Sequence, residues 1–267
     1  MAKKATFVSN DTRVKEIIKV IECIGYKHGI SRVFDDYLTI ASCAISNAVD
    51  MVHFDEREAL YMETIKRYSK EELQHFVEVH AMVVNALEQS LYSKDLLGEL
   101  YHGLNLQNEH NGQFFTPMHI CSMMAKMVLG NVKEQIESKG HIFLSEPTCG
   151  SGAMVIAGAG VVLEQNCNPS ADMCVYAVDN DRRCTMMAYI QLSILGIPAV
   201  VVHGDSLLMK EYARYYTPAY IWNGWLYRQQ CSMTGTVSDD DKALFKLLPE
   251  YFEKIIKAEG EVNNGQI

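Results

Sequence analysis

This sequence lacks closely spaced cysteine pairs, long apolar runs and an excess of positive charge. Each absence excludes a class of protein to which the chain could belong. The eight cysteines include no C-x-x-C pair, and no signal peptide follows the start Met-Ala-Lys-Lys, so we expect reduced thiols in a cytoplasmic protein. No apolar run approaches the roughly 18 residues of a membrane span. The nine histidines lack the spacing of a zinc site, so no metal is predicted.

Acidic residues outnumber basic ones, 33 to 24, for a formal net charge of −9. This balance does not by itself indicate a nucleic-acid partner, so DNA would have to be contacted through a local basic strip. With 48% hydrophobic residues in 267, the chain can bury the core of one large domain or two modest ones.

The stretch from His141 to Ile156 is the first strong motif. An apolar run ends in Glu146, turns through Gly150 and Gly152, and enters an apolar segment of helical length. This order predicts a strand, a glycine loop and a helix. Glycine permits close approach of a ligand, and the first N–H groups of a helix lack intrahelical partners. The corner suits a nucleotide-like or carboxylate-bearing ligand, although an ordinary turn has the same pattern.

Two further apolar runs also end in acids. Met173–Asp179 predicts a second strand, and Ala199–His203 predicts a third that leads into Asp205. An acid at the end of the strand after a glycine loop is the arrangement that binds ribose hydroxyls. Each acid taken singly can instead be a helix cap. Three strands that end in acids at one sheet edge favour a ligand site.

The region before residue 105 is predicted to be helical. Apolar residues recur at three and four positions, which indicates about five packed helices. Asp35 and Asp36 predict the start of the second segment, and Ser69-Lys-Glu-Glu72 has the form of a capping box. Such a domain either only buries its apolar stripes or also contacts a partner or DNA.

Residues 103–113 are polar and glycine-bearing and predict a linker. Pro117 then predicts the start of a helix that runs to about Leu129. Phe115 is either part of the core or a wall of a ligand pocket, and Thr116 with the nearby helix N–H groups can hold a ligand carboxylate.

Together these residues resemble the adenine-specific DNA methyltransferases that include the modification subunits of type I restriction systems. In that family a helical domain precedes four phrases in a fixed order. Here they read Gly112-Gln-Phe-Phe-Thr-Pro117, Glu146-Pro-Thr-Cys-Gly-Ser-Gly152, Val178-Asp-Asn-Asp181 and His203-Gly-Asp-Ser-Leu207. The resemblance covers roughly residues 15–225.

The resemblance implies a pocket for S-adenosylmethionine. It places the methionine end at Thr116, Gly150 and Gly152, the ammonium at Glu146, the ribose hydroxyls at Asp179 and the adenine amino group at Asp205. The implied cofactor-binding set also includes Phe115, Thr148 and Ser151. Glu146 replaces the more usual Asp of the family. Carboxylates suit a ligand that carries a sulfonium and an ammonium.

The catalytic motif of the family, N-P-P-[YF], is absent from this chain. Its Asn and Pro accept hydrogen bonds from the target amine, and its aromatic residue stacks on a flipped-out base. At the expected place beyond Asp205, Tyr220–Trp222 predicts a fourth strand, which puts Asn223 in the Asn position and Trp225 in that of the stacking residue. The alternative is that both residues cap and fill the cleft.

The predicted fold class is α/β: a helical N-terminal domain, residues 1–105, precedes a Rossmann-like methyltransferase domain with a shortened sheet, residues 106–267. A loop through 232–241 and one amphipathic helix, Lys242–Lys257, are expected to end it.

The leading function is adenine N6 methylation of DNA of the restriction-modification type. DNA would be contacted by a basic strip or through a separate specificity subunit. The strip would consist of Arg182, Arg183, Lys210, Arg214 and Arg228. The alternatives are an inactive cofactor- or partner-binding regulator and a methyltransferase that acts on RNA or protein.

Overall fold

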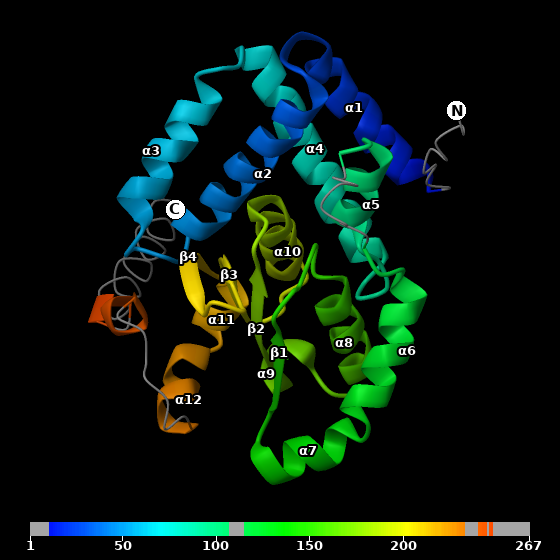
Figure 1. Ribbon diagram of the computed structural model, residues 1–267, viewed down its shortest axis with the longest axis vertical. Coiled ribbons are helices and arrows are strands. Elements are labelled where there is room, and N and C mark those ends of the chain that lie inside the picture. The colour runs from blue at the N-terminus through cyan, green and yellow to red at the C-terminus, as the bar shows by residue number, and fades with distance from the viewer. Residues whose placement is uncertain (1–10, 107–114, 233–239, 245, 248–267) are drawn as a thin grey trace, which may run out of the picture.

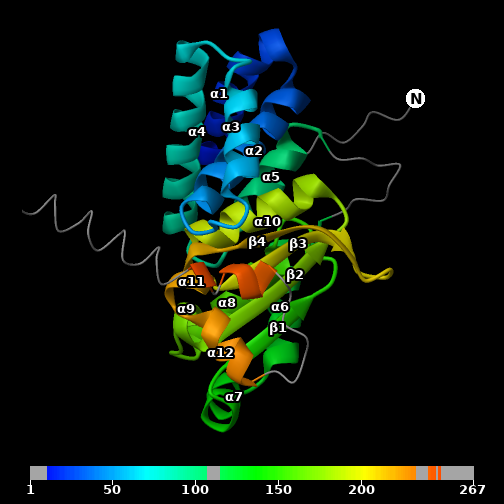
Figure 2. The ribbon, with the colours of Figure 1, turned by 90° about the vertical axis from the view of Figure 1, so that its left-hand side faces the viewer.

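The computed structural model describes residues 11–106, 115–232, 240–244 and 246–247. Five helices come first and form one end of the molecule (Figures 1 and 2). They are α1 (Thr12–His28), α2 (Ile30–Asn47), α3 (Phe54–Ile65), α4 (Lys70–Gln89) and α5 (Leu96–Gly103). The predicted helical region is therefore confirmed.

Of the two helix starts predicted from the sequence, one is confirmed and one is wrong. The capping box at α4 is present, because the Glu72 amide donates to the Ser69 hydroxyl and the Glu72 carboxylate accepts from the Ser69 amide. The prediction that Asp35 and Asp36 start the second helix is wrong. α2 begins at Ile30, after Gly29 has turned the chain with a φ of 86°, and a positive φ is a conformation that glycine adopts without steric cost.

The second half of the chain alternates helices and strands. Its helices are α6 (Met118–Leu129), α7 (Val132–Lys139), α8 (Ala153–Glu164), α9 (Pro169–Asp172), α10 (Arg182–Ile194), α11 (Pro218–Trp222) and α12 (Trp225–Ser232). Its strands are β1 (Ile142–Glu146), β2 (Met173–Asp179), β3 (Ala199–Asp205) and β4 (Lys210–Tyr216), in the sheet order β1-β2-β3-β4. The first three strands are parallel, so the α/β class and the three strands predicted from the sequence are confirmed.

The predicted fourth strand is wrong. Tyr220–Trp222 lies in helix α11, which begins with Pro218 at its first position, where proline's fixed φ favours a helix. The fourth strand is instead Lys210–Tyr216, and it runs antiparallel to β3. Only residues 206–209 separate β3 from β4, and such a short connection reverses the chain, whereas a parallel neighbour needs a long crossover.

The sheet has helices on both faces. Alternate residues such as Val175 and Val201 face the core shared with α8, α10 and the N-terminal helices. The intervening residues, such as Cys174 and Val202, face a smaller core with Trp225 and Leu244. Because helices on both sides of position 105 contribute to one core, the two regions pack as neighbours, and the domain boundary at that position stays a prediction.

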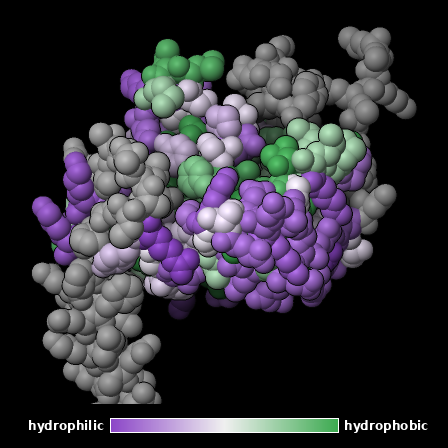
Figure 3. Space-filling view, turned by 90° about the horizontal axis from the view of Figure 1, so that it is seen from below, coloured by the Kyte–Doolittle hydropathy of each residue, from purple (hydrophilic) through white to green (hydrophobic). Residues whose placement is uncertain are grey.

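The carboxyl ends of β1, β2 and β3 point toward the N-terminal helices, while α7, α9, α11 and α12 lie at the opposite end (Figure 1). Viewed from that opposite end, the surface is largely hydrophilic, with smaller apolar patches beside it (Figure 3). The predicted C-terminal helix, Lys242–Lys257, is helical at 242–244 and 246–247, and its other residues lie outside the described part of the chain. The predicted loop over 232–241 is wrong at its ends, since Ser232 closes α12 and 240–241 are helical.

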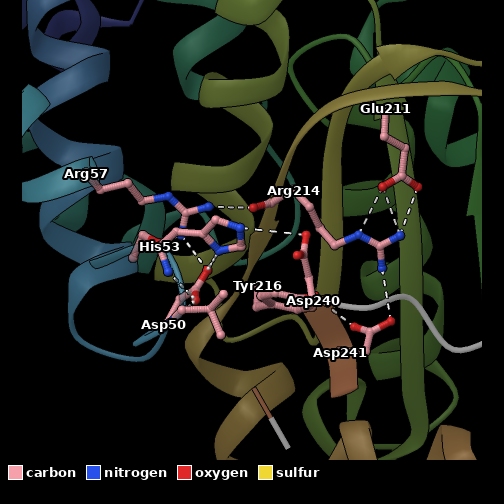
Figure 4. Close-up of polar contacts among 10 residues, drawn as sticks. Asp50, His53, Arg57, Glu211, Arg214, Tyr216, Asp240 and Asp241 are labelled. Carbon is pink, nitrogen blue, oxygen red and sulfur yellow. Dashed lines mark hydrogen bonds and ion pairs between the residues drawn. The ribbon is translucent and has the colours of Figure 1, made fainter. Parts of the chain in front are cut away.

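Arg57 of α3 forms a buried ion pair with Asp50, just before that helix, and a hydrogen bond to β4 (Figure 4). Arg57, 7% exposed, donates to the Ser46 hydroxyl, to Asp50 Oδ2 at 2.5 Å and to the Arg214 carbonyl at 2.6 Å. Asp50 is fully buried and also accepts from His53 Nδ1 at 2.9 Å. This hydrogen bond raises the pKa of His53.

We predict that Arg57→Met lowers the free energy of unfolding by about 3–5 kcal/mol, because it removes the permanent cation from the buried Asp50 carboxylate and leaves His53 as its remaining ion-pair partner. Denaturant unfolding measures the change. Lys126→Ala is the matched control, since Lys126 pairs with Glu164 on the surface with both side chains more than half exposed, and its loss costs at most about 1 kcal/mol. Equal effects of the two substitutions would contradict the prediction.

Candidate functional site

A cavity of about 630 Å³ lies at the carboxyl ends of β1 and β2. It is lined by Phe115, Thr116, Cys121, Met124, Glu146, Thr148, Cys149, Gly150, Ser151, Ala153, Met154, Asp179 and Cys184. Seven of the nine residues predicted to bind a cofactor are in this set, and the other two are Gly152 and Asp205. The structure therefore brings most of the predicted site together.

The glycine loop between β1 and α8 is tied to β2. The Cys149 amide donates to the Val178 carbonyl at 2.8 Å, and the Gly150 amide donates to Asp179 Oδ2 at 2.8 Å. Gly150 and Gly152 have φ angles of 54° and 97°, which residues with a Cβ rarely adopt. The loop therefore needs both glycines to turn from the strand into the helix.

Gly152 lies beneath the cavity rather than in its wall. It is buried, and a Cβ added there would lie 3.4 Å from the Ala188 Cα of α10. A Cβ at Gly150 would lie 3.5 Å from the Phe115 ring. Gly150 thus leaves room beside the Phe115 ring, and Gly152 brings the start of α8 against Ala188 of α10.

The start of α8 adds positive potential to the cavity. Gly152 makes no side-chain cap hydrogen bond for the helix, and the first residues of α8, Ala153 and Met154, line the cavity. The N-terminal N–H groups of a helix favour an anion such as a carboxylate.

Two carboxylates, Glu146 and Asp179, stand at the ends of neighbouring strands and line the same cavity. Burial raises the pKa of Asp179, although the amides of Asp181 and Gly150 both donate to its carboxylate. Carboxylates in this position suit hydroxyl, amine or cationic groups of a ligand.

Three cysteine thiols also face the cavity, and sequence reasoning did not single them out. Burial raises the pKa values of Cys121, Cys149 and Cys184, so all three are neutral thiols at pH 7 and serve as apolar wall rather than as nucleophiles. Cys149 falls within the glycine phrase, but no spacing in the sequence points to Cys121 or Cys184.

Asp205 lies at the same sheet edge as the cavity but not in its lining. Its Oδ1 accepts hydrogen bonds from the amides of Leu207 and Leu208, both at 2.9 Å. The carboxylate thus orders the turn between β3 and β4. Leu207, Leu208 and Met209 in that turn are 94%, 73% and 87% exposed.

The structure separates Asn223 and Trp225 from the cavity. Both follow α11 at the amino-terminal edge of the parallel strands, because β4 returns the chain to that edge. The Asn223 amide donates to Ser170 of α9, and the fully buried Trp225 contacts His141 at the start of β1. They fill this end of the sheet and not the cleft, so the prediction that they take the catalytic Asn and stacking positions beside the cofactor pocket is corrected.

The five basic residues predicted to form a DNA-binding strip are Arg182, Arg183, Lys210, Arg214 and Arg228, and they do not form a continuous strip. Arg183 pairs with Asp35 at 2.6 Å, and Arg214 pairs with Glu211 at 2.8 Å. Arg228 lies on α12 at the far end of the sheet, where its guanidinium stacks over Trp225. These three of the five charges are therefore engaged by partners within the fold.

Residues 92–230, just over half of the chain, match the family model described as N-6 DNA Methylase. The chain belongs to the N-6 DNA methylase family. The matched region contains α5, the whole sheet and every residue of the cavity lining. Membership makes the protein a methyltransferase by family and implies S-adenosylmethionine as its cofactor and DNA as its substrate.

The cavity fits this cofactor of the N-6 DNA methylases. It offers helix N–H groups for the cofactor's carboxylate, an acid at each of two strand ends for its ammonium and ribose, and a gap preserved by Gly150. When bound, S-adenosylmethionine supplies a methyl group on a cationic sulfur.

One solved structure, described as a class I S-adenosylmethionine-dependent methyltransferase from Listeria monocytogenes, is similar with a TM-score of 0.36 and 13% identity. The similarity covers 89% of this chain and 79% of that one. At this level it says nothing about function, and the family assignment rests on the sequence match. No curated protein matches the chain significantly. Among the described residues, no helix is long and apolar enough to cross a membrane.

We predict opposite effects for two glycine substitutions on or next to α8. Gly152→Ala lowers the free energy of unfolding by about 1–3 kcal/mol, because its positive φ strains any residue with a Cβ. Gly158→Ala raises it by up to about 1 kcal/mol, since this glycine is inside the helix and an added Cβ meets only ordinary contacts of 3.5 Å or more. Denaturant unfolding checks both signs, and stabilisation by Gly152→Ala would contradict the account.

Proposed function

We propose that this protein binds S-adenosylmethionine in the cavity at the ends of β1 and β2 and transfers its methyl group to the N6 amine of adenine in DNA. One observation carries the proposal. In a chain of the N-6 DNA methylase family, the glycine loop is hydrogen-bonded to Asp179 beside Glu146. This is the combination of anion-binding helix start and strand-end carboxylates that the cofactor needs.

The proposed roles follow the charges of the ligand. The start of α8 and the glycine loop hold the carboxylate of the methionine end, and Glu146 holds its ammonium. Asp179 accepts hydrogen bonds from the ribose hydroxyls, while Phe115 closes one side and excludes water. Thr116, Thr148 and Ser151 lie around the same cavity and complete the proposed set. For Asp205 we propose a contact with the adenine amino group. Its Oδ2 would accept that hydrogen bond, because Oδ1 already accepts from the amides of the turn between β3 and β4.

No described residue beside the cavity reproduces the family's N-P-P motif. This observation favours a second candidate function, a regulator that holds cofactor without transfer. A methyltransferase that acts on RNA or protein is a third candidate. For the leading function we propose that a partner, such as a specificity subunit of a restriction-modification system, brings the DNA, and that the complex works in the cytoplasm.

We predict that Asp179→Asn weakens S-adenosylmethionine binding about 10- to 100-fold, because hydrogen bonds to a charged acceptor contribute about 1.5–3 kcal/mol. Titration calorimetry measures the affinity. In the wild type the affinity should fall as the pH is lowered through the raised pKa of Asp179, since protonation removes the carboxylate's charge; the variant should lack this dependence. Asp55→Asn, at an exposed position on α3, is the control for loss of one charge.

The transfer reaction itself is tested with methyl-labelled cofactor and mixed-sequence DNA, alone and with candidate specificity subunits. The proposal expects label on adenine N6, and Asp179→Asn should reduce it. Tight cofactor binding with no transfer to any DNA, under either condition, would favour the regulator. Label on RNA or protein instead would favour the third candidate.

A further inference from the structure

A buried polar cluster lies behind the glycine loop, and the roles proposed for the cofactor site account for only one of its three members. It consists of Asp95, Ser151 and Gln191, which are 8%, 1% and 0% exposed. The Ser151 hydroxyl donates to Asp95 Oδ2, and the Gln191 side-chain amide donates to Asp95 Oδ1 at 2.9 Å and to the Ser151 carbonyl at 2.8 Å. The three residues come from three different parts of the chain.

Asp95 is the N-cap of α5, which belongs to the helical region that precedes the sheet. Its Oδ1 also accepts from the Gly98 amide at 3.0 Å, and the Leu97 amide donates to Gln191 Oε1 at 3.0 Å. Gln191 is on α10 and Ser151 is inside the glycine loop. The cluster therefore ties one end of α5 to the backbone of the loop.

The other end of α5 supports the opposite wall of the cavity. Tyr101 packs against the Phe115 ring with centroids 5.7 Å apart, and the His102 ring meets it edge-on at 5.0 Å. Phe115 in turn faces Gly150 across the cavity mouth. The same eight-residue helix thus holds the loop through its first turn and the aromatic wall through its last.

The packing at Gly98 shows how closely the Asp95 carboxylate is held. A Cβ at Gly98 would lie 2.1 Å from Asp95 Oδ2, closer than any side chain can approach. Glycine at this position is what permits the carboxylate to cap α5 and to reach Ser151 together.

We infer that Asp95 is a positioning residue for the cofactor site. Through Ser151 and Gln191 it fixes the glycine loop against α5, so that cofactor affinity depends on a helix that lies outside the sheet. A buried network with every member bonded holds its groups in one geometry, and removing one member leaves the others without partners. The inference rests on the proposed cofactor function.

Asp95→Ala in the full chain tests the inference through two readouts. Hydrogen–deuterium exchange of the segment 148–153 is measured without cofactor, and S-adenosylmethionine affinity is measured by calorimetry. We expect faster exchange in this segment and an affinity loss of about tenfold or more, with Asp95→Asn intermediate in both. Asp36→Ala is the matched control, because Asp36 is an equally buried aspartate, 5% exposed, that accepts from Tyr68 and Arg67 away from the cavity.

The control should lose stability yet keep wild-type loop exchange and affinity. If Asp95→Ala changes the loop and the affinity no more than Asp36→Ala does, the cluster is merely structural and the inference is overturned. If Asp95→Ala does not fold, Asp95→Asn alone decides the test, since it keeps the shape of the side chain and removes its charge. If the wild type binds no cofactor, the proposed function fails, and loop exchange alone decides whether Asp95 positions the loop.

Discussion

The cavity exists because the glycine loop is bonded to the neighbouring strand. The amides of Cys149 and Gly150 donate to the end of β2, which bends the chain sharply after Glu146 and directs the start of α8 toward the same edge. Parallel pairing of β1 with β2 puts the two strand-end acids beside each other. Were the strands antiparallel, these acids would lie at opposite edges, and no ligand could meet both together with the helix start.

The sequence predicted these elements, and the start of α4, well because their determinants are local. A glycine pair after an apolar run, an acid at a strand end and a capping box at Ser69 each act within a few residues. The prediction failed at Tyr220–Trp222, where an apolar triplet suggested a strand. The turn at 206–209 had already reversed the chain and Pro218 had started a helix. Because β4 runs back along the sheet, Asn223 lies at the amino-terminal edge of the parallel strands, opposite the cavity.

The contacts of α5 could not be predicted from the sequence, because they join residues that are far apart along the chain. Asp95 and Ser151 are 56 positions apart, and Asp95 and Gln191 are 96 apart. In the sequence, Asp95 reads as nothing more than a helix cap, and Gln191 as a polar residue within an apolar helix. Only tertiary packing makes them one cluster. The helical region, predicted to precede the cofactor domain, supports two residues of the cavity lining from behind, Ser151 through Asp95 and Phe115 through Tyr101.

The contact between Arg57 and the Arg214 carbonyl spans 157 positions, and this separation matters during synthesis. A ribosome adds roughly 5–20 residues per second, so the acceptor of Arg57 on β4 is synthesised roughly 8–30 s after Arg57 itself. During that interval the N-terminal helices hold a charged side chain whose native environment is incomplete. The hydrogen bond from Arg57 to β4 can therefore form only after β4 has been synthesised, whereas its contacts with Ser46 and Asp50 need only the N-terminal helices.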